Sequence, residues 1–202
     1  MRGRTPRLVL DWDGTCTEID GLHLILEQFG DRAVYNRVEG ELGNGLTLHE
    51  VIEAEFATVT LPLDQAVAWV RENVTLRAGF HELAERQQPV IVSSGFRELI
   101  EPVLAREGVE LEVVANGLDP SPHGWRPVWR DEEICATCGE ACKRRSLAGV
   151  PYVFVGDGYS DRCAALAATR VFARDGLARW LDAQGVAYGP FDDLRDVLVA
   201  LA

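Results

Sequence analysis

The feature that most constrains the fold of this chain is the stretch at residues 8–15, LVLDWDGT. Three apolar residues that lead into a polar, glycine-containing turn are typical of a buried strand in a parallel sheet. Ligands of such sheets collect at the carboxyl ends of the strands, where Asp11 and Asp13 fall. Gly14 and Thr15 end the strand and offer backbone N–H groups and a hydroxyl to an anion. Because neighbouring carboxylates repel each other, the stretch predicts a divalent metal ion, although an acidic turn without function has the same local sequence.

Residues 18–75 predict helices, because their apolar residues recur at helical spacing. Thr47 and Glu50 form the pattern of a capping box at the start of one of these helices. A block of helices directly after the first strand fits poorly into a single crossover connection between parallel strands. We therefore expect a small helical cap, inserted into a catalytic core that comprises residues 1–17 and 76–202.

From residue 78 onward, predicted strands and helices alternate. Strands are expected at residues 89–92, 109–115, 152–155 and 170–173, and a hairpin or flap within residues 116–134. This alternation predicts an α/β fold with a Rossmann-like, doubly wound parallel sheet. Two of the strands end as the first one does, in Ser93-Ser94-Gly95 and in Gly156–Asp161. We expect the three turns to meet in one site, because the carboxyl ends of parallel strands lie at the same edge.

The polar groups at these strand ends are those that phosphoryl transfer requires, with Lys143 as an additional compact cation. Asp11 can attack phosphorus and form an aspartyl-phosphate. Asp13 can protonate the leaving alkoxide and later activate water. Magnesium keeps several of its waters, so Asp11 and Asp157 suffice as carboxylate ligands. Asp161 either binds the metal or orients a water bound to it, and we favour the second role.

Four segments, in this order along the chain, resemble the motifs of the haloacid dehalogenase superfamily of phosphohydrolases. These segments are Asp11–Thr15, Ser93, Lys143 and Gly156–Asp161. The resemblance covers essentially the whole chain and implies a Rossmann-like core with a helical cap between the first two motifs. It implies that Asp11 is the nucleophile and Asp13 the general acid and base.

The resemblance, together with the turns at the strand ends, predicts the residues that bind the substrate and the metal. The expected phosphate-binding residues are Gly14, Thr15, Ser93, Ser94, Gly95 and Lys143. The expected magnesium ligands are Asp11, Asp157 and the backbone carbonyl of Asp13, with Asp161 and Ser160 beside them. The implied activity is magnesium-dependent hydrolysis of a small phosphorylated metabolite.

Within the superfamily, the chain is most similar to the phosphoserine phosphatase branch. It departs from that branch at Ser94, where a glycine is common, at Ser160, where asparagine is usual, and at Asp20, where a substrate-binding glutamate is usual. The Cys-Lys pair at the third motif is more similar to a sister group. That group contains the 2-hydroxy-3-keto-5-methylthiopentenyl-1-phosphate phosphatases and the phosphocholine and phosphoethanolamine phosphatases.

Two further groups of residues are candidates for binding. Asp20 and His23 lie close enough to the first motif to reach a substrate, and we hold them as candidates for substrate specificity. Cys135, Cys138 and Cys142 have the spacing of three zinc ligands, and His123 or Cys163 could supply a fourth. For these cysteines, unligated buried thiols and a local disulfide are the alternatives to a structural zinc ion.

Composition excludes several classes of partner. The net charge of −12 argues against binding to the nucleic-acid backbone, which requires clustered lysine and arginine. No apolar run approaches the roughly 18 residues that cross a bilayer, and the basic N-terminal stretch precedes too few apolar residues for a signal peptide. We therefore expect a cytoplasmic enzyme, a monomer or a homodimer, that acts on a small phosphate ester without a nucleic-acid or membrane partner.

Three other functions stay open at this stage. One is phosphoserine phosphatase activity proper, and another is a haloalkanoate dehalogenase. Asp13 argues against the dehalogenase, because departure of a halide needs no acid. The third is a non-catalytic protein that binds a metal or a phosphorylated metabolite. The presence of a nucleophile, an acid, a lysine and a metal carboxylate argues against it.

Overall fold

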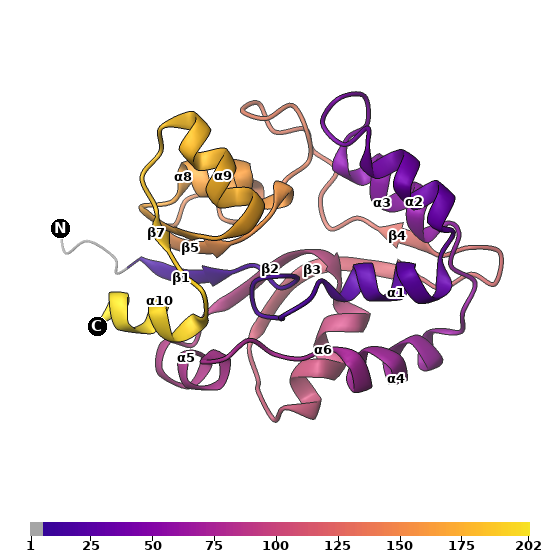
Figure 1. The fold of residues 1–202 in the computed structure, drawn as a ribbon, viewed down its shortest axis with the longest axis horizontal. Coiled ribbons are helices and arrows are strands. Elements are labelled where there is room, and N and C mark those ends of the chain that lie inside the picture. The colour runs from indigo at the N-terminus through magenta and orange to yellow at the C-terminus, as the bar shows by residue number, and fades with distance from the viewer. Residues whose placement is uncertain (1–5) are drawn as a thin grey trace.

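A computed structural model describes residues 6–202 as one seven-stranded sheet between layers of helices (Figure 1). The strands are β1 Arg7–Leu10, β2 Val90–Phe96, β3 Glu112–Asp119, β4 Arg126–Val128, β5 Tyr152–Gly156, β6 Arg170–Ala173 and β7 Gly189–Pro190. Their order is β4-β3-β2-β1-β5-β6-β7, and all neighbours are parallel except β3 and β4. The predicted α/β class and doubly wound parallel sheet are confirmed, with β1 at the centre.

Helices cover both faces of this sheet (Figure 1). One face carries α5 Phe80–Gln87, α6 Arg97–Arg106 and α10 Leu194–Leu201, and the other carries α8 Arg162–Ala167 and α9 Asp175–Gln184. Two short elements precede α8 in the chain, the helix α7 Lys143–Ser146 and the 3-10 turn η1 Tyr159–Asp161. Leu8 and Leu10 of β1 pack in the cluster that contains Phe80, whereas Val9 packs in the cluster that contains Leu177. Burial on both faces explains why the apolar residues of β1 are consecutive.

Between β1 and α5 the chain forms four helices. These are α1 Gly21–Phe29, α2 Arg32–Glu39, α3 Leu48–Phe56 and α4 Leu63–Asn73. The predicted capping box is present at the start of α3, where Thr47 and Glu50 bind each other's backbone N–H groups. Asp20 and Asp31 cap α1 and α2 through their side chains. The helical content of this block matches the sequence pattern, while the boundaries of a separate cap domain stay a prediction.

The two ends of this helical insert lie side by side. Thr17 and Leu76 form an antiparallel bridge, and the backbone N–H of Glu18 donates to the carbonyl of Thr75 at 2.9 Å. The chain therefore leaves the core and returns to it at the same place.

The predicted hairpin in residues 116–134 is formed by β3 and β4, and it packs against the insert. The buried indole of Trp125 donates to the carbonyl of Leu61 at 2.8 Å and lies over the ring of Phe56. The ring of Trp129 stacks on His49, with ring centroids 3.7 Å apart. The hairpin thus joins the core sheet to α3 and to the loop before α4.

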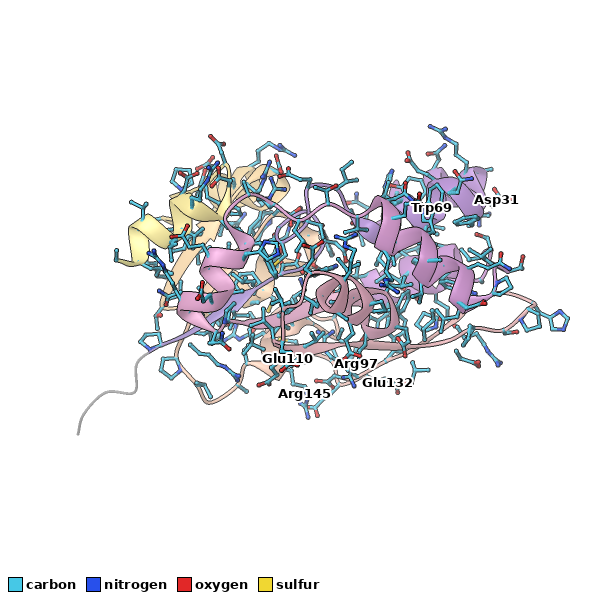
Figure 2. The ribbon with its side chains drawn as sticks, turned by 90° about the horizontal axis from the view of Figure 1, so that it is seen from below. Asp31, Trp69, Arg97, Glu110, Glu132 and Arg145 are labelled. Carbon is cyan, nitrogen blue, oxygen red and sulfur yellow. The ribbon has the colours of Figure 1, made fainter. Side chains whose placement is uncertain are left out.

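Charged side chains project from the outside of the fold. Figure 2 labels exposed examples on several elements, Asp31, Arg97, Glu110, Glu132 and Arg145. None of the helices between residues 6 and 202 combines the length and the apolarity that a bilayer crossing needs. The prediction about an N-terminal signal peptide falls largely on residues 1–5, which lie outside the described residues.

Candidate active site

The carboxyl ends of β1, β2 and β5 meet opposite the helices α1, α2 and α3, and a cavity of about 250 Å³ lies between them. The predicted site residues on its wall are Asp11, Asp13, Asp20, His23, Ser93, Ser94, Gly95, Asp157 and Ser160. The structure therefore brings together residues that are as much as 149 positions apart in the sequence, between Asp11 and Ser160. The convergence arises from the parallel pairing of the three strands.

Lys143 lies immediately behind this wall and is completely buried. Its Nζ atom donates to Oδ1 of Asp161 at 2.7 Å and to Oδ1 of Asp11. Burial lowers the pKa of the Lys143 ammonium, but the carboxylates of Asp11 and Asp161 outweigh that effect and raise this pKa. The lysine therefore stays charged and fixes one oxygen of Asp11.

Asp161 holds two segments together. Its Oδ1 atom accepts from Lys143, and its Oδ2 atom accepts from the backbone N–H groups of Asp157 at 2.9 Å and Gly158 at 3.0 Å. Both carboxylate oxygens are thus engaged by the chain itself. These contacts favour a positioning role for Asp161 over direct binding of a metal.

Asp157 approaches the turn after β1 very closely. The Thr15 hydroxyl donates to Oδ1 of Asp157 at 2.7 Å. Gly14 has φ +73°, and a Cβ atom at that position would lie 2.4 Å from Oδ2 of Asp157, so only glycine fits there. Because the Thr15 hydroxyl is engaged by Asp157, its expected contact with phosphate stays a prediction.

The carboxylates at the strand ends repel one another. One oxygen from each of Asp11, Asp157 and Asp161 lies within 4.8 Å of the others. Burial and then Asp161 raise the pKa of Asp11 well above its ordinary value, and the same two causes raise that of Asp157 to about 7. Burial and then Asp20 raise the pKa of Asp13. A buried set of mutually repelling oxygen donors has the chemistry that a hard divalent cation requires, so these residues fit magnesium.

Asp13 and Ser93 face each other across Gly95. The Ser93 Oγ atom accepts from the N–H of Gly95 at 2.8 Å, and Oδ1 of Asp13 accepts from the N–H of Gly21 at 2.8 Å. A Cβ atom at Gly95 would lie 3.0 Å from Oδ2 of Asp13 and 3.1 Å from Oγ of Ser93. The absent side chain at Gly95 keeps this part of the cavity open, and α1 holds the Asp13 carboxylate through Gly21.

Arg77 is an important residue that the sequence motifs do not include. It is buried, and its guanidinium donates to the carbonyls of Gly14 at 2.7 Å, Thr15 at 2.9 Å and Thr17 at 2.9 Å. Burial lowers the pKa of the Arg77 guanidinium, and the positive charge of Arg174 lowers it further. An arginine nevertheless stays charged under all ordinary conditions. Arg77 therefore fixes the turn that carries Gly14 and Thr15. Only its place directly after the helical insert distinguishes it in the sequence.

Asn116 and Arg130 support the end of β2 in the same way. The Asn116 Nδ2 atom donates to the carbonyl of Ser94 at 2.8 Å, and the guanidinium of Arg130 donates to the carbonyl of Ser93. The backbone N–H of Arg130 in turn donates to Oδ1 of Asn116 at 3.2 Å. Asn116 belongs to β3 and Arg130 to the loop after β4, and no local sequence pattern predicts their contacts with β2.

The opposite side of the cavity is formed by the helical insert and is acidic. Asp20 lies there and caps α1, and the ring of His23 contacts the Tyr35 hydroxyl at 2.7 Å. Glu39 and Glu55, which the sequence analysis missed, add two more carboxyl groups. Within the described part of the chain, Oε1 of Glu55 is buried without a hydrogen-bond partner. Burial and then Glu39 raise the pKa of Glu55 to about 8.

Known proteins resemble this chain in sequence and in fold. A family model described as haloacid dehalogenase-like hydrolase matches residues 8–166. A 2-hydroxy-3-keto-5-methylthiopentenyl-1-phosphate phosphatase from Geobacillus kaustophilus is 32% identical over 98% of this chain and 96% of its own length. One from Bacillus mycoides is 27% identical over 95% and 93%.

Solved structures of phosphoserine phosphatases share the fold. One, holding an analogue of the phospho-aspartyl intermediate, has a TM-score of 0.71 at 18% identity and covers 98% of this chain and 99% of its own. Another, from T. onnurineus, has a TM-score of 0.68 at 21% identity and covers 95% and 92%.

This chain belongs to the haloacid dehalogenase-like hydrolases, as its four motifs predicted. Within that family it is a phosphatase, an enzyme whose substrates are small phosphorylated molecules.

Proposed function

We propose that this phosphatase hydrolyses a small phosphate monoester in two steps, through an aspartyl-phosphate formed on Asp11. The observation that carries the proposal is the arrangement of two carboxylates on one cavity wall, with one of them fixed by the buried Lys143. Lys143 holds one oxygen of Asp11, so the other oxygen can be directed at phosphorus. Asp13, held by the N–H of Gly21, lies on the same wall and can reach the leaving group.

In the first step, a bond forms between Asp11 and phosphorus while the bond from phosphorus to the ester oxygen breaks. Asp13 donates its proton to that oxygen, so the alcohol leaves as a neutral molecule. In the second step, Asp13 takes a proton from water as the water attacks phosphorus. The bond between phosphorus and Asp11 breaks, phosphate leaves, and both aspartates return to their starting states.

The remaining groups balance the charge of the phosphoryl group. Magnesium, held by Asp11, Asp157 and the backbone carbonyl of Asp13, would offset the negative charge of the phosphate. The Ser93 hydroxyl and backbone N–H groups at the ends of β1 and β2 would bind phosphoryl oxygens, and Lys143, buried behind the wall, would add its positive charge. Asp161 positions Lys143, and Arg77 positions the turn at Gly14.

The acidic side of the cavity constrains the alcohol part of the substrate. Asp20, Glu39 and Glu55 would accept hydrogen bonds from hydroxyl or ammonium groups there. The relatives' names make 2-hydroxy-3-keto-5-methylthiopentenyl-1-phosphate the first substrate to examine. The three carboxyl groups keep phosphoserine, whose ammonium group they would bind, as the second candidate.

The proposal is tested by measuring phosphate release with magnesium, from both candidate esters and from an aryl phosphate. Asp11→Asn should lower kcat by at least about 1,000-fold on every ester, because amide nitrogen and oxygen are poor nucleophiles. Asp64→Asn, at an exposed position on α4, serves as the matched control and should leave kcat unchanged. Full turnover by a folded Asp11→Asn protein would contradict the assignment. Release of halide from a haloalkanoate without phosphatase activity would favour the dehalogenase.

A further inference from the structure

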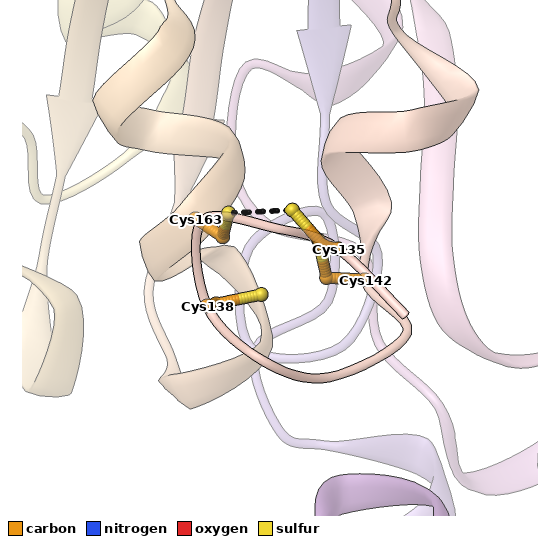
Figure 3. Close-up of side chains that lie close together, drawn as sticks. All are labelled: Cys135, Cys138, Cys142 and Cys163. Carbon is orange, nitrogen blue, oxygen red and sulfur yellow. Dashed lines mark hydrogen bonds between the residues drawn. The ribbon is translucent and has the colours of Figure 1, made fainter. Parts of the chain in front are cut away.

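Four of the five cysteines form a cluster outside the catalytic cavity (Figure 3). Cys135, Cys138 and Cys142 belong to the loop before α7, and Cys163 belongs to α8. Their Sγ atoms all lie within 4.8 Å of one another. The sequence left open whether His123 or Cys163 is the fourth candidate ligand, and the structure places Cys163 in the cluster. The cluster joins two segments that are separate in the sequence.

The distance between two of the sulfur atoms is that of a tetrahedral thiolate site, and the other two sulfurs lie close to them. Zinc–sulfur bonds of about 2.3 Å place the sulfurs of a tetrahedron about 3.8 Å apart. The Sγ atoms of Cys135 and Cys163 are 3.8 Å apart, and all of the cysteines in the described part of the chain are free thiols. The backbone N–H of Thr137 also points at Sγ of Cys135 at 3.4 Å, a contact that supports a thiolate ligand.

The alternative of simple packing accounts poorly for this cluster. Thiols that act as small apolar side chains are usually buried. Cys163 is buried, but Cys135 is half-buried and Cys138 is exposed. The loop also turns back on itself at the cysteines, where the N–H of Gly139 donates to the carbonyl of Cys135 at 2.8 Å. A short loop that gathers three thiols toward a fourth is better explained by a ligand that they share.

We propose that these four thiolates bind a structural zinc ion, and that this ion positions Lys143. Cys142 directly precedes Lys143, and Cys163 lies two residues after Asp161. The ion pair between Lys143 and Asp161 therefore joins the same two segments that the zinc ion would join. With both the zinc ion and the ion pair joining these segments, the position of Lys143 is restricted more than it would be by the ion pair alone.

The cysteine loop, which comprises residues 135–142, also contacts the helical insert. Glu140, between Cys138 and Cys142, accepts from the Tyr159 hydroxyl at 2.7 Å and from the backbone N–H of Leu48 at 3.1 Å. Leu48 begins α3, which lines the cavity. An ordered cysteine loop thus contacts both η1 and the insert.

The metal content of the purified full-length protein tests the zinc site directly. Protein prepared under reducing conditions and dialysed against zinc should contain about one zinc ion per chain by elemental analysis. Cys163→Ser and Cys138→Ser should lose most of it. Cys16→Ala, which removes the cysteine outside the cluster, is the matched control and should retain it. Iron in place of zinc would overturn the identity of the metal, and metal-free protein with four reactive thiols would overturn the site.

A measurement on the unaltered chain covers the case in which the variants fail to fold. Metal-free wild-type protein titrated with Co²⁺ should develop the visible absorption bands of tetrahedral thiolate cobalt, and zinc should remove them. Absence of these bands from the wild-type protein would overturn the proposal. The result does not depend on phosphatase activity, so failure of the zinc site and failure of the aspartyl-phosphate mechanism are distinguishable.

The positioning of Lys143 needs its own readout. With magnesium in excess, removal of zinc should lower kcat several-fold while the zinc-free protein stays folded, and added zinc should restore it. An unchanged kcat, with zinc demonstrably removed, would overturn the positioning role and leave the metal site intact.

Discussion

The two sides of the cavity differ in how their side chains are held. The strand-end wall comprises Asp11, Asp13, Ser93, Asp157 and the supporting Lys143, and the cap wall comprises Asp20, His23, Tyr35, Glu39 and Glu55. On the strand-end wall, sheet register places Leu10 beside both Ile91 and Val155, so the residues that follow each strand must lie close together. On the cap wall, the packing of helices decides which side chains face inward.

This difference explains why the sequence predicts the type of reaction but not the substrate. Sheet pairing converts a short motif into a fixed position at the sheet edge. A helix carries a polar side chain into a cavity only if its apolar stripe packs at one particular rotation. Buried partners hold the strand-end wall, whereas Oε1 of Glu55 is buried without a hydrogen-bond partner among the described residues. Changes on the strand-end wall should therefore have the larger effects.

After the loss of the nucleophile itself, the largest effect is expected for Asp13→Asn, measured with two classes of ester. For an alkyl phosphate kcat should fall by about 100- to 10,000-fold, because the alkoxide leaves without a proton donor. For an aryl phosphate with an acidic phenol, the formation of the phosphoenzyme should be much less affected, because that leaving group needs no proton. Rapid-mixing measurements of phenol release would separate this step from the hydrolysis that follows. Equal losses in this first step for the two esters would contradict the role of Asp13 as the acid.

Removing the buried cation should reduce stability as well as activity. Lys143→Met leaves Asp11 and Asp161 buried without their partner, and we expect the free energy of unfolding to fall by about 3–5 kcal/mol. Arg145→Met, which removes exposed ion pairs two residues later, should cost no more than about 1 kcal/mol. Urea unfolding of the two variants makes the comparison. Similar losses for both would mean that the buried ion pair contributes no more than a surface pair.

Arg77→Gln tests the support behind the strand-end wall. The shorter, neutral side chain loses donors to three carbonyls, and we expect a loss of about 2–3 kcal/mol of stability. Because the turn at Gly14 and Thr15 loosens, kcat should fall about tenfold while KM changes little. Arg71→Gln, at an exposed position on α4, is the control for removal of an arginine. A change confined to KM would indicate that Arg77 acts on substrate binding instead.

The smallest of these effects is expected on the cap wall, from Glu55→Gln. The pKa of Glu55 in the folded protein, about 8, lies above its ordinary value of 4.5, so folding disfavours the charged form. The wild-type protein should therefore lose stability as pH rises from about 5 to 8. The glutamine side chain of the variant does not titrate, and the variant should gain about 1–2 kcal/mol relative to wild type over this interval after allowance for solvent access.

Urea unfolding of Glu55→Gln at pH 5 and pH 8 measures this gain. Glu53→Gln, on the exposed side of the same helix, is the matched control. Parallel pH profiles for the wild-type and Glu55→Gln proteins would show that Glu55 keeps an ordinary pKa.

The sequence predicted the parts of the fold that depend on local pattern. The class of fold, the hairpin and the capping box at Thr47 follow from apolar spacing and turn residues. Strand lengths were predicted less well, since β2 continues to Phe96 and β3 to Asp119. β3 extends because its last residues pair with β4, a contact that the residues of β3 alone do not signal.

The same limit applies to the candidate site. The motif residues converge as expected, but their supports at Arg77, Asn116 and Arg130 come from distant segments. A hydrogen bond from a buried side chain to a backbone carbonyl cannot be predicted from the type of the accepting residue, because every residue has a carbonyl. Glu39 and Glu55 were missed because an acidic residue on an amphipathic helix is ordinarily on the solvent side.

The paired ends of the helical insert have a consequence for how such an enzyme can be recombined. Since Thr17 and Leu76 lie side by side, a foreign segment grafted between them would begin and end where the native one does, without altering the register of the sheet. The graft would still lack the surface that packs against the hairpin. Trp125 of the hairpin donates a hydrogen bond to the carbonyl of Leu61 and packs against the ring of Phe56, and both partners belong to the native insert. The exchangeable unit is therefore discontinuous, and consists of the insert together with the β3–β4 hairpin.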